Sequence, residues 1–419
     1  MIKTIKNGNL SGTVPAIASK SHAHRLLICA ALADRPTRIR CTTTNADIDA
    51  TAACLTSLGA DITREGEYFT VTPIREVKKG QTIDCGESGS TMRFLLPVVL
   101  ALGADASLLG HGRLPSRPLS PLYEELISHG AILAPQGTNP LGCRGCLTSG
   151  DYTIDGGVSS QFISGLMFAL PLLGEKSRII ITGKAESRPY IDLTLSALRT
   201  FGVDIRETEP NTFSIFPSVY TSPHEICTEG DWSNAAFWLT AGAFSEAGIT
   251  VTTLDPDSIQ GDRRITAILA DLGAHVTFHN DAVTVKRAVP LHGITVDASD
   301  IPDLVPILSV AAAGAIGKTA ITGCGRLRLK ESDRIETVCA MIRSLGGKIS
   351  SEGDTIIITG KGTLTGGTAD SANDHRIAMA ASIAAGICTA PVTVTGAEAV
   401  AKSYPDFYSD LIKLNGEVL

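Results

Sequence analysis

The chain has 419 residues, of which 43% are hydrophobic and 19% charged, and such a composition is typical of a globular protein with two or more domains. Its 36 basic and 43 acidic residues give a net charge of −7. This balance argues against nucleic acid as the main partner, because neutralising phosphates requires a basic face. The first residues, MIKTIKNGNL, lack the apolar part of a signal peptide. The longest apolar run, 305–317, is too short to span a membrane. We therefore expect a soluble, cytoplasmic protein that does not contact membranes.

A glycine motif recurs along the chain at a nearly constant spacing. The glycine follows an apolar segment and precedes an aliphatic residue at six positions, which are Gly59, Gly130, Gly202, Gly273, Gly346 and Gly416. Successive glycines are 71, 72, 71, 73 and 70 residues apart. Each copy predicts a helix that ends in a left-handed glycine cap and is followed by a strand.

A second pattern has the same period. A polar cluster opens a very apolar segment at six places, which are marked by Ser21, Ser90, Ser160, Ser233, Asp303 and Asp374. Because serine and aspartate are favourable N-cap residues, we expect six helices that begin here. These helices are apolar on nearly all sides, so they should be buried. The sequence thus predicts an α/β protein built from six repeated units, three in each of two domains.

Basic residues gather near these predicted helix starts. A helix N-terminus attracts anions through its free N–H groups and its dipole, and arginine pairs bidentately with phosphate and carboxylate. The basic residues concerned are Lys20, Arg25, Arg93, Arg113, Arg117, Arg326, Arg328, Lys330, Arg334, His375, Arg376 and Lys402. Taken singly, each could be a solvated surface charge. Their recurrence at one phase of the repeat indicates a ligand with several negative charges.

Other chemistry has little support in the sequence. The chain has no GxxxxGK[ST] loop and no HExxH motif, and it has no GxSxG motif. Its CxxC pair, Cys143 and Cys146, lacks the second pair that a zinc ribbon needs, and its role stays open. We expect neither a metal nor a cofactor.

Ten short segments together carry a more specific signal. They are SKSHAHR (19–25), GESGSTMR (86–93), RPLSPL (117–122), SSQF (159–162), SRPYID (187–192), GDWSNAAF (230–237), IPD (301–303), LKESDR (329–334), NDHRIAMA (373–380) and KSYPDF (402–407). In this order they resemble the 5-enolpyruvylshikimate-3-phosphate (EPSP) synthase family over nearly the full length. The resemblance implies a two-domain inside-out α/β barrel with three βαβαββ-type units in each domain. It places the domains at 19–228 and at 1–18 joined with 229–419, with the active site in the cleft between them.

The resemblance also implies a reaction. The enolpyruvyl group of phosphoenolpyruvate is transferred to the 5-hydroxyl of shikimate 3-phosphate, and phosphate is released, as a step of the shikimate pathway. Addition and elimination proceed through a tetrahedral intermediate, without a cofactor. Both substrates carry a phosphate and a carboxylate, in agreement with the basic residues above. We expect a monomer.

Site residues follow by resemblance at the matching positions. Asp303 is the base for the 5-hydroxyl, while Glu331 and Lys20 carry protons to C3 and to the leaving phosphate. The residues implied for shikimate 3-phosphate are Lys20, Ser21, Arg25, Ser159, Ser160, Gln161, Ser187, Asp303 and Lys330, supported by Arg188. Those implied for phosphoenolpyruvate are Lys20, Gly89, Arg117, Gln161, Arg334, Arg376 and Lys402. Gly89 allows the chain to approach the ligand closely.

Two alternatives stay open at this point. A related enolpyruvyl transferase, which acts on UDP-N-acetylglucosamine, shares the fold and the chemistry. That relative carries Lys-Asn where this chain has Lys20-Ser21, and it has a cysteine in the loop that corresponds to the cysteine-free segment 105–117. The other alternative is an anion-binding protein without catalysis, which would have lost acid–base groups such as Asp303 and Glu331.

Two positions near Gly89 depart from the familiar pattern of the family. Glu87 and Ser90 stand where many relatives have asparagine and threonine. An added carboxylate at Glu87 could change the affinity for phosphoenolpyruvate. The response to its mimic glyphosate therefore stays open.

Overall fold

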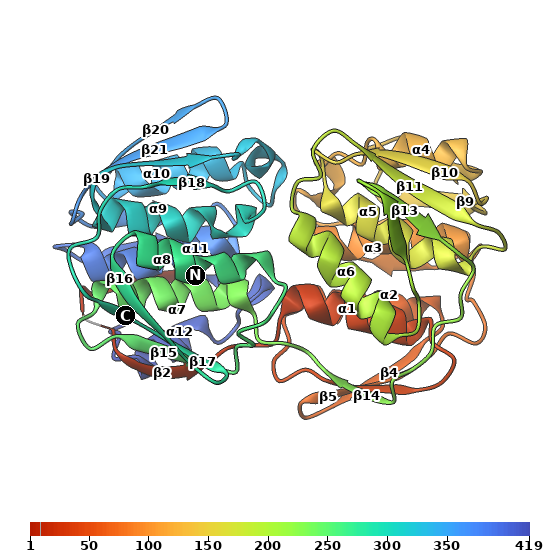
Figure 1. Ribbon diagram of the computed structural model, residues 1–419, viewed down its shortest axis with the longest axis horizontal. Helices are drawn as coiled ribbons and strands as arrows, with labels where there is room; N and C mark the ends of the chain where they lie inside the picture. The colour runs from red at the N-terminus through yellow and green to blue at the C-terminus, as the bar shows by residue number, and fades with distance from the viewer. Residues whose placement is uncertain (9) are drawn as a thin grey trace. The chain divides into compact units, whose positions relative to one another are not determined.

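The computed structural model describes residues 1–8 and 10–419, which form two compact units (Figure 1). Unit 1 comprises residues 1–19 and 229–419, and unit 2 comprises residues 20–228. The chain crosses from one unit to the other twice, after Ser19 and after Thr228.

Unit 2 contains six α-helices and three sheets of four strands. The helices are α1 (Lys20–Ala31), α2 (Ala46–Leu58), α3 (Gly89–Ala101), α4 (Leu122–Ser128), α5 (Ser160–Ala169) and α6 (Arg188–Thr200). The strands are β3 (Thr37–Arg40), β4 (Asp61–Glu65), β5 (Tyr68–Thr72), β6 (Thr82–Asp84), β7 (Ala106–Leu109), β8 (Ala131–Leu133), β9 (Leu141–Gly145), β10 (Asp151–Asp155), β11 (Ser177–Thr182), β12 (Arg206–Glu209), β13 (Thr212–Ile215) and β14 (Glu225–Cys227).

Unit 1 has a matching set of elements within its described residues. The helices are α7 (Trp232–Phe244), α8 (Ile265–Asp271), α9 (Val305–Gly314), α10 (Arg334–Ser344), α11 (His375–Ala384) and α12 (Phe407–Lys413). The strands are β1 (Ile2–Ile5), β2 (Gly12–Pro15), β15 (Ile249–Thr252), β16 (Ala274–His279), β17 (Ala282–Arg287), β18 (Thr295–Asp297), β19 (Ile316–Thr322), β20 (Lys348–Glu352), β21 (Thr355–Lys361), β22 (Gly367–Asp370) and β23 (Val392–Thr395).

The same strand order recurs in five of the six sheets and confirms the predicted βαβαββ repeat there, whereas the sixth sheet, β1-β23-β22, has three strands within the described residues. In the run β6–α3–β7–α4–β8–β9, for example, the sheet has the order β6-β7-β9-β8, with the first two strands parallel and the remaining pairs antiparallel. The run β18–α9–β19–α10–β20–β21 has the same arrangement. Where the chain crosses between units, the first strand comes from a distant segment, because β14 pairs with β3 and β2 pairs with β15.

The six apolar helices are buried, as their sequences predict. In α7 every residue from Trp232 to Ala243 is buried, and in α9 every residue from Val305 to Ala313 is buried. α1, α3, α5 and α11 bury almost as much of their length. In Figure 1 these helices are stacked across the middle of each unit, with sheets above and below them. Burial on this scale is the main source of stability for such a fold.

The predicted helix ends are mostly confirmed, with one exception. The glycines at 59, 130, 202, 273 and 346 have positive φ angles between 76° and 119°, and Gly59 donates to carbonyls of the last turn of α2. At the sixth position, however, Asn415 adopts the left-handed conformation with φ 67°, and Gly416 does not. Asparagine tolerates this region better than most residues, so it can replace glycine here.

The predicted helix starts are wrong by one or two residues at several places. The capping side chains are Ser88 for α3, Ser159 for α5 and Asp231 for α7, each of which accepts a hydrogen bond from a backbone N–H of the first turn. Asp374 caps α11 as predicted. Asp303 is not the N-cap residue of α9, which is Leu304; it lies inside the 3-10 turn Pro302–Leu304 that precedes this helix.

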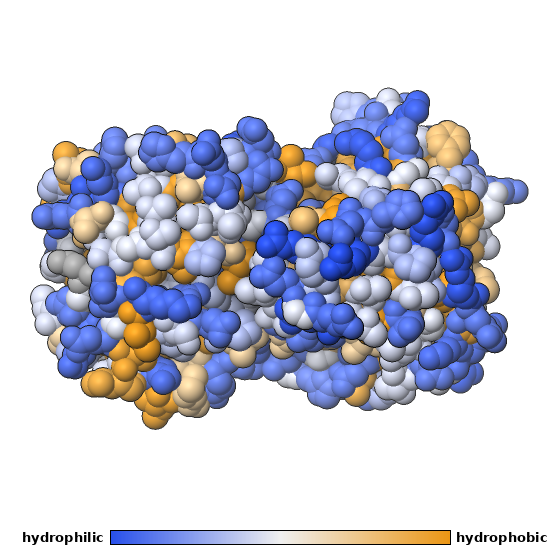
Figure 2. Space-filling view, turned by 90° about the horizontal axis from the view of Figure 1, so that it is seen from below, coloured by the Kyte–Doolittle hydropathy of each residue, from blue (hydrophilic) through white to orange (hydrophobic). Residues whose placement is uncertain are grey.

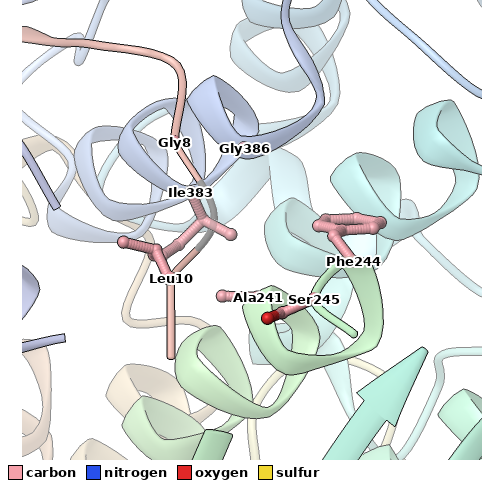
Figure 3. Close-up of a pocket in the computed structure, with 7 residues that line it drawn as sticks. All are labelled: Gly8, Leu10, Ala241, Phe244, Ser245, Ile383 and Gly386. Carbon is pink, nitrogen blue, oxygen red and sulfur yellow. The ribbon is translucent and has the colours of Figure 1, made fainter. Parts of the chain in front are cut away.

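Polar side chains cover most of the face shown in Figure 2, and apolar ones reach the surface in scattered groups, as is usual for a folded protein. In the part of the chain that the structure describes, no helix is long and apolar enough to cross a membrane. A small cavity lies between the C-terminal ends of α7 and α11 (Figure 3), with room for about 10 Å³, roughly one water molecule. A larger cavity of about 650 Å³ shares Phe244 and Gly386 with it.

Candidate active site

Asp303 lies at the centre of a cluster of charged side chains in unit 1. Its carboxylate accepts hydrogen bonds from Arg334 Nη1 at 2.8 Å, Arg376 Nη2 at 3.1 Å and Lys330 Nζ at 3.3 Å. Three cations on one carboxylate form a dense network in a site that is mostly shielded from solvent. Burial lowers the pKa of Lys330 although Asp303 opposes this effect.

Arg334 joins three carboxylates in this cluster. Its side chain is only 1% exposed and binds Glu331 Oε2 at 2.7 Å and Asp374 Oδ2 at 2.8 Å, in addition to Asp303. These carboxylates keep the pKa of Arg334 above its ordinary value in spite of burial. Burial alone would raise the pKa of Asp374, but the charge of Arg334 holds it below the usual value. The arginine is therefore fixed in position and permanently charged.

Asp262 belongs to the same cluster, although no sequence motif predicted it. It lies in the 3-10 turn Gly261–Arg264 and accepts a hydrogen bond from the Ser233 hydroxyl on α7. Burial and the negative charge of Asp303 raise the pKa of Asp262 to about 7, with Arg376 opposing them. A buried carboxyl that titrates near neutral pH can exchange protons with its surroundings.

The contacts of this cluster bring the starts of three buried helices together. Ser233 is at the start of α7, Asp303 precedes α9, and Arg376 is in the first turn of α11. Lys402, near the C-terminus of the chain, donates to the backbone carbonyl of Asn373 at 2.7 Å and so lies beside the start of α11. The N-termini of these three helices of unit 1 therefore lie close together.

In unit 2 the predicted basic residues of α1 are held by neighbouring elements. Lys20 Nζ pairs with Asp47 Oδ2 of α2 at 2.8 Å, and both side chains are largely buried. Arg25 donates through Nε to Thr194 Oγ1 at 2.8 Å and through Nη2 to the carbonyl of Tyr190 at 2.8 Å. Burial lowers the pKa of Arg25 to about 10, so it stays charged at neutral pH.

A second network in unit 2 surrounds Gly89. Arg93 Nη1 donates to Gln161 Oε1 at 2.9 Å, and Gln161 Nε2 donates to Ser90 Oγ at 2.9 Å, which ties α3 to α5. A Cβ atom on Gly89 would lie 2.5 Å from Arg117 Nη1 and 2.9 Å from Arg93 Nη1. Gly89 therefore lets two guanidinium groups approach the start of α3. Arg93 was noted in the sequence but was not assigned to the site.

Ser21 is the second residue of α1, and the other predicted residues lie at the starts of α5 and α6. Ser159 caps α5 and Ser160 is its first residue, so the hydroxyl of Ser159 is used within the helix start. Ser187 precedes α6, is buried, and has a left-handed backbone with φ 55°. Arg188 is engaged by other groups, because its guanidinium pairs with Glu207 at 2.7 Å and Asp192 at 2.8 Å.

The charged cluster of unit 1 around Asp303 and the charged cluster of unit 2, formed by the residues of α1 and those around Gly89, can both bind anions. Each offers cations in fixed positions and helix N-termini. The cluster of unit 1 adds carboxylates, which can accept and return protons. Within residues 1–8 and 10–419, no group of three or more His, Cys, Asp or Glu side chains is arranged to hold a metal ion. The two cavities of unit 1 are at the other ends of α7 and α11 and contain none of these charged residues.

Comparison with known proteins decides the family. A sequence profile of the EPSP synthases (3-phosphoshikimate 1-carboxyvinyltransferases) matches residues 5–411. The chain is 39% identical over 417 residues to the 3-phosphoshikimate 1-carboxyvinyltransferase of Clostridium kluyveri, with 99% of this chain and 97% of the relative covered. The chain belongs to the EPSP synthase family. A second relative of the same name, from Clostridium novyi, is 40% identical and covers 97% of this chain and 96% of its own length.

Solved structures of this family have the same fold. The EPSP synthase of Acinetobacter baumannii superposes with a TM-score of 0.82 at 26% identity, and the match covers 100% of this chain and 99% of that structure. The mixed α/β architecture of the EPSP synthase family therefore extends over the whole chain, and every segment that carries the two charged clusters lies inside the matched region.

Proposed function

We propose that this protein transfers the enolpyruvyl group of phosphoenolpyruvate to the 5-hydroxyl of shikimate 3-phosphate and releases phosphate. The observation that carries the proposal is the sequence identity of 39–40% to 3-phosphoshikimate 1-carboxyvinyltransferases over nearly the full length. The contacts of the expected charged residues within unit 1 and within unit 2 support it. As such, the protein serves the shikimate pathway, which leads to aromatic amino acids, and acts as a cytoplasmic monomer.

The two clusters divide the substrates between them in this proposal. Shikimate 3-phosphate binds mainly to unit 2, through the residues Lys20, Ser21, Arg25, Ser159, Ser160, Gln161 and Ser187, with Asp303 and Lys330 added from unit 1. Phosphoenolpyruvate binds to Gly89, Arg117 and Gln161 of unit 2, to Arg334, Arg376 and Lys402 of unit 1, and to Lys20. The active site then forms in a cleft where both units contact the ligands, with the domain limits at 19–228 and at 1–18 joined with 229–419.

The reaction proceeds by addition and elimination. Asp303 accepts the proton of the 5-hydroxyl while the hydroxyl oxygen forms a bond to C2 of phosphoenolpyruvate. C3 receives a proton from Glu331 or Lys20, which gives a tetrahedral ketal phosphate. Loss of a proton from C3 and of phosphate from C2 then produces the enol ether. The fixed cations stabilise the negative charge that builds up on the carboxylate and phosphate oxygens.

The contacts of Asp303 support its proposed role in the first step. Its carboxylate is held by Arg334, Arg376 and Lys330, so its position is fixed before the substrate binds. Arg334 in turn contacts Glu331, which brings both proposed proton carriers of unit 1 onto one arginine.

Phosphate release tests the proposal. The purified protein is incubated with phosphoenolpyruvate and either shikimate 3-phosphate or UDP-N-acetylglucosamine, with and without a chelator. We expect release only with shikimate 3-phosphate, unchanged by the chelator. Release only with the nucleotide sugar would identify the related transferase instead. No release with either acceptor, together with measurable binding of shikimate 3-phosphate, would identify an anion-binding protein without catalysis.

A further inference from the structure

A buried chain of hydrogen bonds runs from α1 through α2 to the start of α3. His24 Nδ1 lies 2.6 Å from Thr51 Oγ1, and Thr51 Oγ1 lies 2.7 Å from Thr91 Oγ1. Thr91 Oγ1 donates to Ser88 Oγ at 2.7 Å. All four side chains are at most 1% exposed. No step proposed above uses any of them.

The donor at one end of this chain fixes the direction of all its protons. A hydroxyl has a single proton, and the proton of Thr91 is given to Ser88. The bond between Thr51 and Thr91 must then use the proton of Thr51. Thr51 has no second proton to offer to His24, so His24 Nδ1 must carry the hydrogen and donate it to Thr51. The chain therefore runs from His24 to Ser88.

The environment of His24 agrees with this neutral tautomer. Burial lowers the pKa of His24 well below its ordinary value, and the charges of Lys20 and Arg25 add to this effect. The other ring nitrogen, Nε2, is buried and has no hydrogen-bond partner in the structure. An acceptor nitrogen without a partner is better tolerated than an N–H group without one, which again places the hydrogen on Nδ1.

At the far end, the proton of Ser88 is left over. Ser88 Oγ already accepts from the Thr91 hydroxyl and, as the cap of α3, from the Thr91 backbone N–H at 3.3 Å. Among the described residues, no acceptor is found for the proton of Ser88 itself. Ser88 is directly followed by Gly89, where the guanidinium groups of Arg93 and Arg117 approach the polypeptide backbone. An anionic oxygen bound beside Gly89 is the natural acceptor for this proton.

α2 supports both ends of this arrangement. Asp47, which holds Lys20, and Thr51, which continues the chain from His24, are four residues apart and therefore lie on one face of the helix. The same helix thus fixes a cation at the start of α1 and the hydroxyl groups that lead to the start of α3.

We propose that His24 is a positioning residue: its Nδ1–H orders the hydroxyls of Thr51 and Thr91 so that Ser88 donates its proton to an anionic oxygen of phosphoenolpyruvate. The inference rests on the function proposed above. His24 touches no substrate and acts through the three hydroxyl groups. Removal of the first donor lets the chain of protons reverse, so that Ser88 turns its proton inward and no longer donates to the ligand.

Paired substitutions of His24 test the direction of the chain. In His24→Asn the amide N–H takes the place of Nδ1–H, whereas in His24→Gln the amide lies near the position of Nε2. We expect His24→Gln to raise the KM for phosphoenolpyruvate by about tenfold, the effect of one lost hydrogen bond to a charged group, while the KM for shikimate 3-phosphate stays within about twofold. His24→Asn should keep both KM values near those of the wild type.

Thr51→Val provides the same test without changing α1. It removes the hydroxyl at nearly constant volume, and it should raise the KM for phosphoenolpyruvate as His24→Gln does. The double variant His24→Gln/Thr51→Val should have the same KM for phosphoenolpyruvate as either single variant, because both substitutions interrupt the same chain of hydrogen bonds. Thr37→Val is the matched control. It removes a buried hydroxyl of β3 that donates to Ser222 Oγ at 2.8 Å, and the KM values of this variant should not change.

The outcomes separate this inference from the proposed function. Equal KM values for phosphoenolpyruvate in the wild type, His24→Gln and Thr51→Val would overturn the positioning role, as would equal rises for both substrates. If His24→Gln does not fold, Thr51→Val decides the question. A wild-type protein that turns over phosphoenolpyruvate with neither acceptor would instead contradict the proposed function.

Discussion

At the scale of single residues, substitution of Asp303 is the strictest test of the proposed proton transfer from the 5-hydroxyl. Asp303→Asn keeps one oxygen, which can still accept from Arg334 and Lys330, but it replaces the oxygen that accepts from Arg376 by an NH2 group. The amide also cannot accept the proton of the 5-hydroxyl. We expect kcat to fall by about 10²–10⁴-fold, the usual contribution of a proton-transfer group. Steady-state kinetics with shikimate 3-phosphate would measure this loss.

Asp257→Asn is a suitable control for this substitution, because Asp257 is an exposed aspartate of the same unit. It should leave kcat unchanged. A kcat of Asp303→Asn within a factor of a few of the wild-type value would contradict the assignment of Asp303 as the base.

Asp262 predicts a dependence of stability on pH. Burial and Asp303 raise its pKa from 3.8 to about 7 in the folded protein. Between these values the folded state binds more protons at this site than the unfolded state, so the site lowers stability as the pH rises from about 4 to about 7 and contributes nothing further above that. Asp262→Asn should remove the effect.

Urea unfolding at pH 5, 6, 7 and 8 measures the free energy of unfolding and so tests this prediction. Relative to the wild type, Asp262→Asn should gain stability with rising pH, by at most about 1.4 kcal/mol per pH unit, and the gain should level off above pH 7. Asp257→Asn should show no such trend. A constant difference between Asp262→Asn and the wild type from pH 5 to pH 8 would show that Asp262 is ionised throughout.

At the scale of elements, the start of α3 depends on the absence of a side chain at Gly89. In Gly89→Ala the new Cβ would lie 2.5 Å from Arg117 Nη1, so this guanidinium must move. The backbone of α3 itself accepts alanine readily. We expect the KM for phosphoenolpyruvate to rise about tenfold or more, as after loss of a charged hydrogen bond, with little change in Tm.

Gly174→Ala is the matched control for this change, since a Cβ there meets no atom within 4 Å. Its KM and Tm should equal those of the wild type. An unchanged KM for phosphoenolpyruvate in Gly89→Ala would show that Arg117 does not bind phosphoenolpyruvate where it approaches Gly89.

Much of the element scale could be predicted from the sequence, because the glycines and apolar segments repeat with one period. The residues at which the helices begin could be predicted less accurately. Neighbouring polar residues such as Ser88 and Ser90 can both cap a helix, and the structure uses Ser88. Asp303 was predicted to cap α9, but Pro302 at the first position favours the 3-10 turn that contains it.

The site was predictable only in part, for a physical reason. Its cations stand in recognisable motifs, whereas the carboxylates that hold them are distant in sequence. Asp47 is 27 residues from Lys20, and Asp374 is 40 residues from Arg334. Such pairs arise only when helices pack against each other, and local patterns do not specify them. The chain from His24 to Ser88 was missed for the same reason.

At the scale of the whole molecule, two charged clusters lie in two units that are joined by only two crossings of the chain. We predict that shikimate 3-phosphate draws the units together, because ligands that bind both units favour a closed state. Small-angle X-ray scattering should show a smaller radius of gyration with shikimate 3-phosphate than without it. An identical radius under saturating ligand would contradict domain closure.

The most direct test of the account is the mass spectrum of the product formed in D₂O from phosphoenolpyruvate and shikimate 3-phosphate. Addition gives C3 a solvent deuteron, and elimination then removes any one of the hydrogens on the rotating methyl group. We expect an enolpyruvyl ether of shikimate 3-phosphate in which a fraction of the molecules carries deuterium on the vinyl CH₂ carbon. A product without deuterium would contradict addition and elimination, and the absence of the enolpyruvyl ether would contradict the proposed function itself.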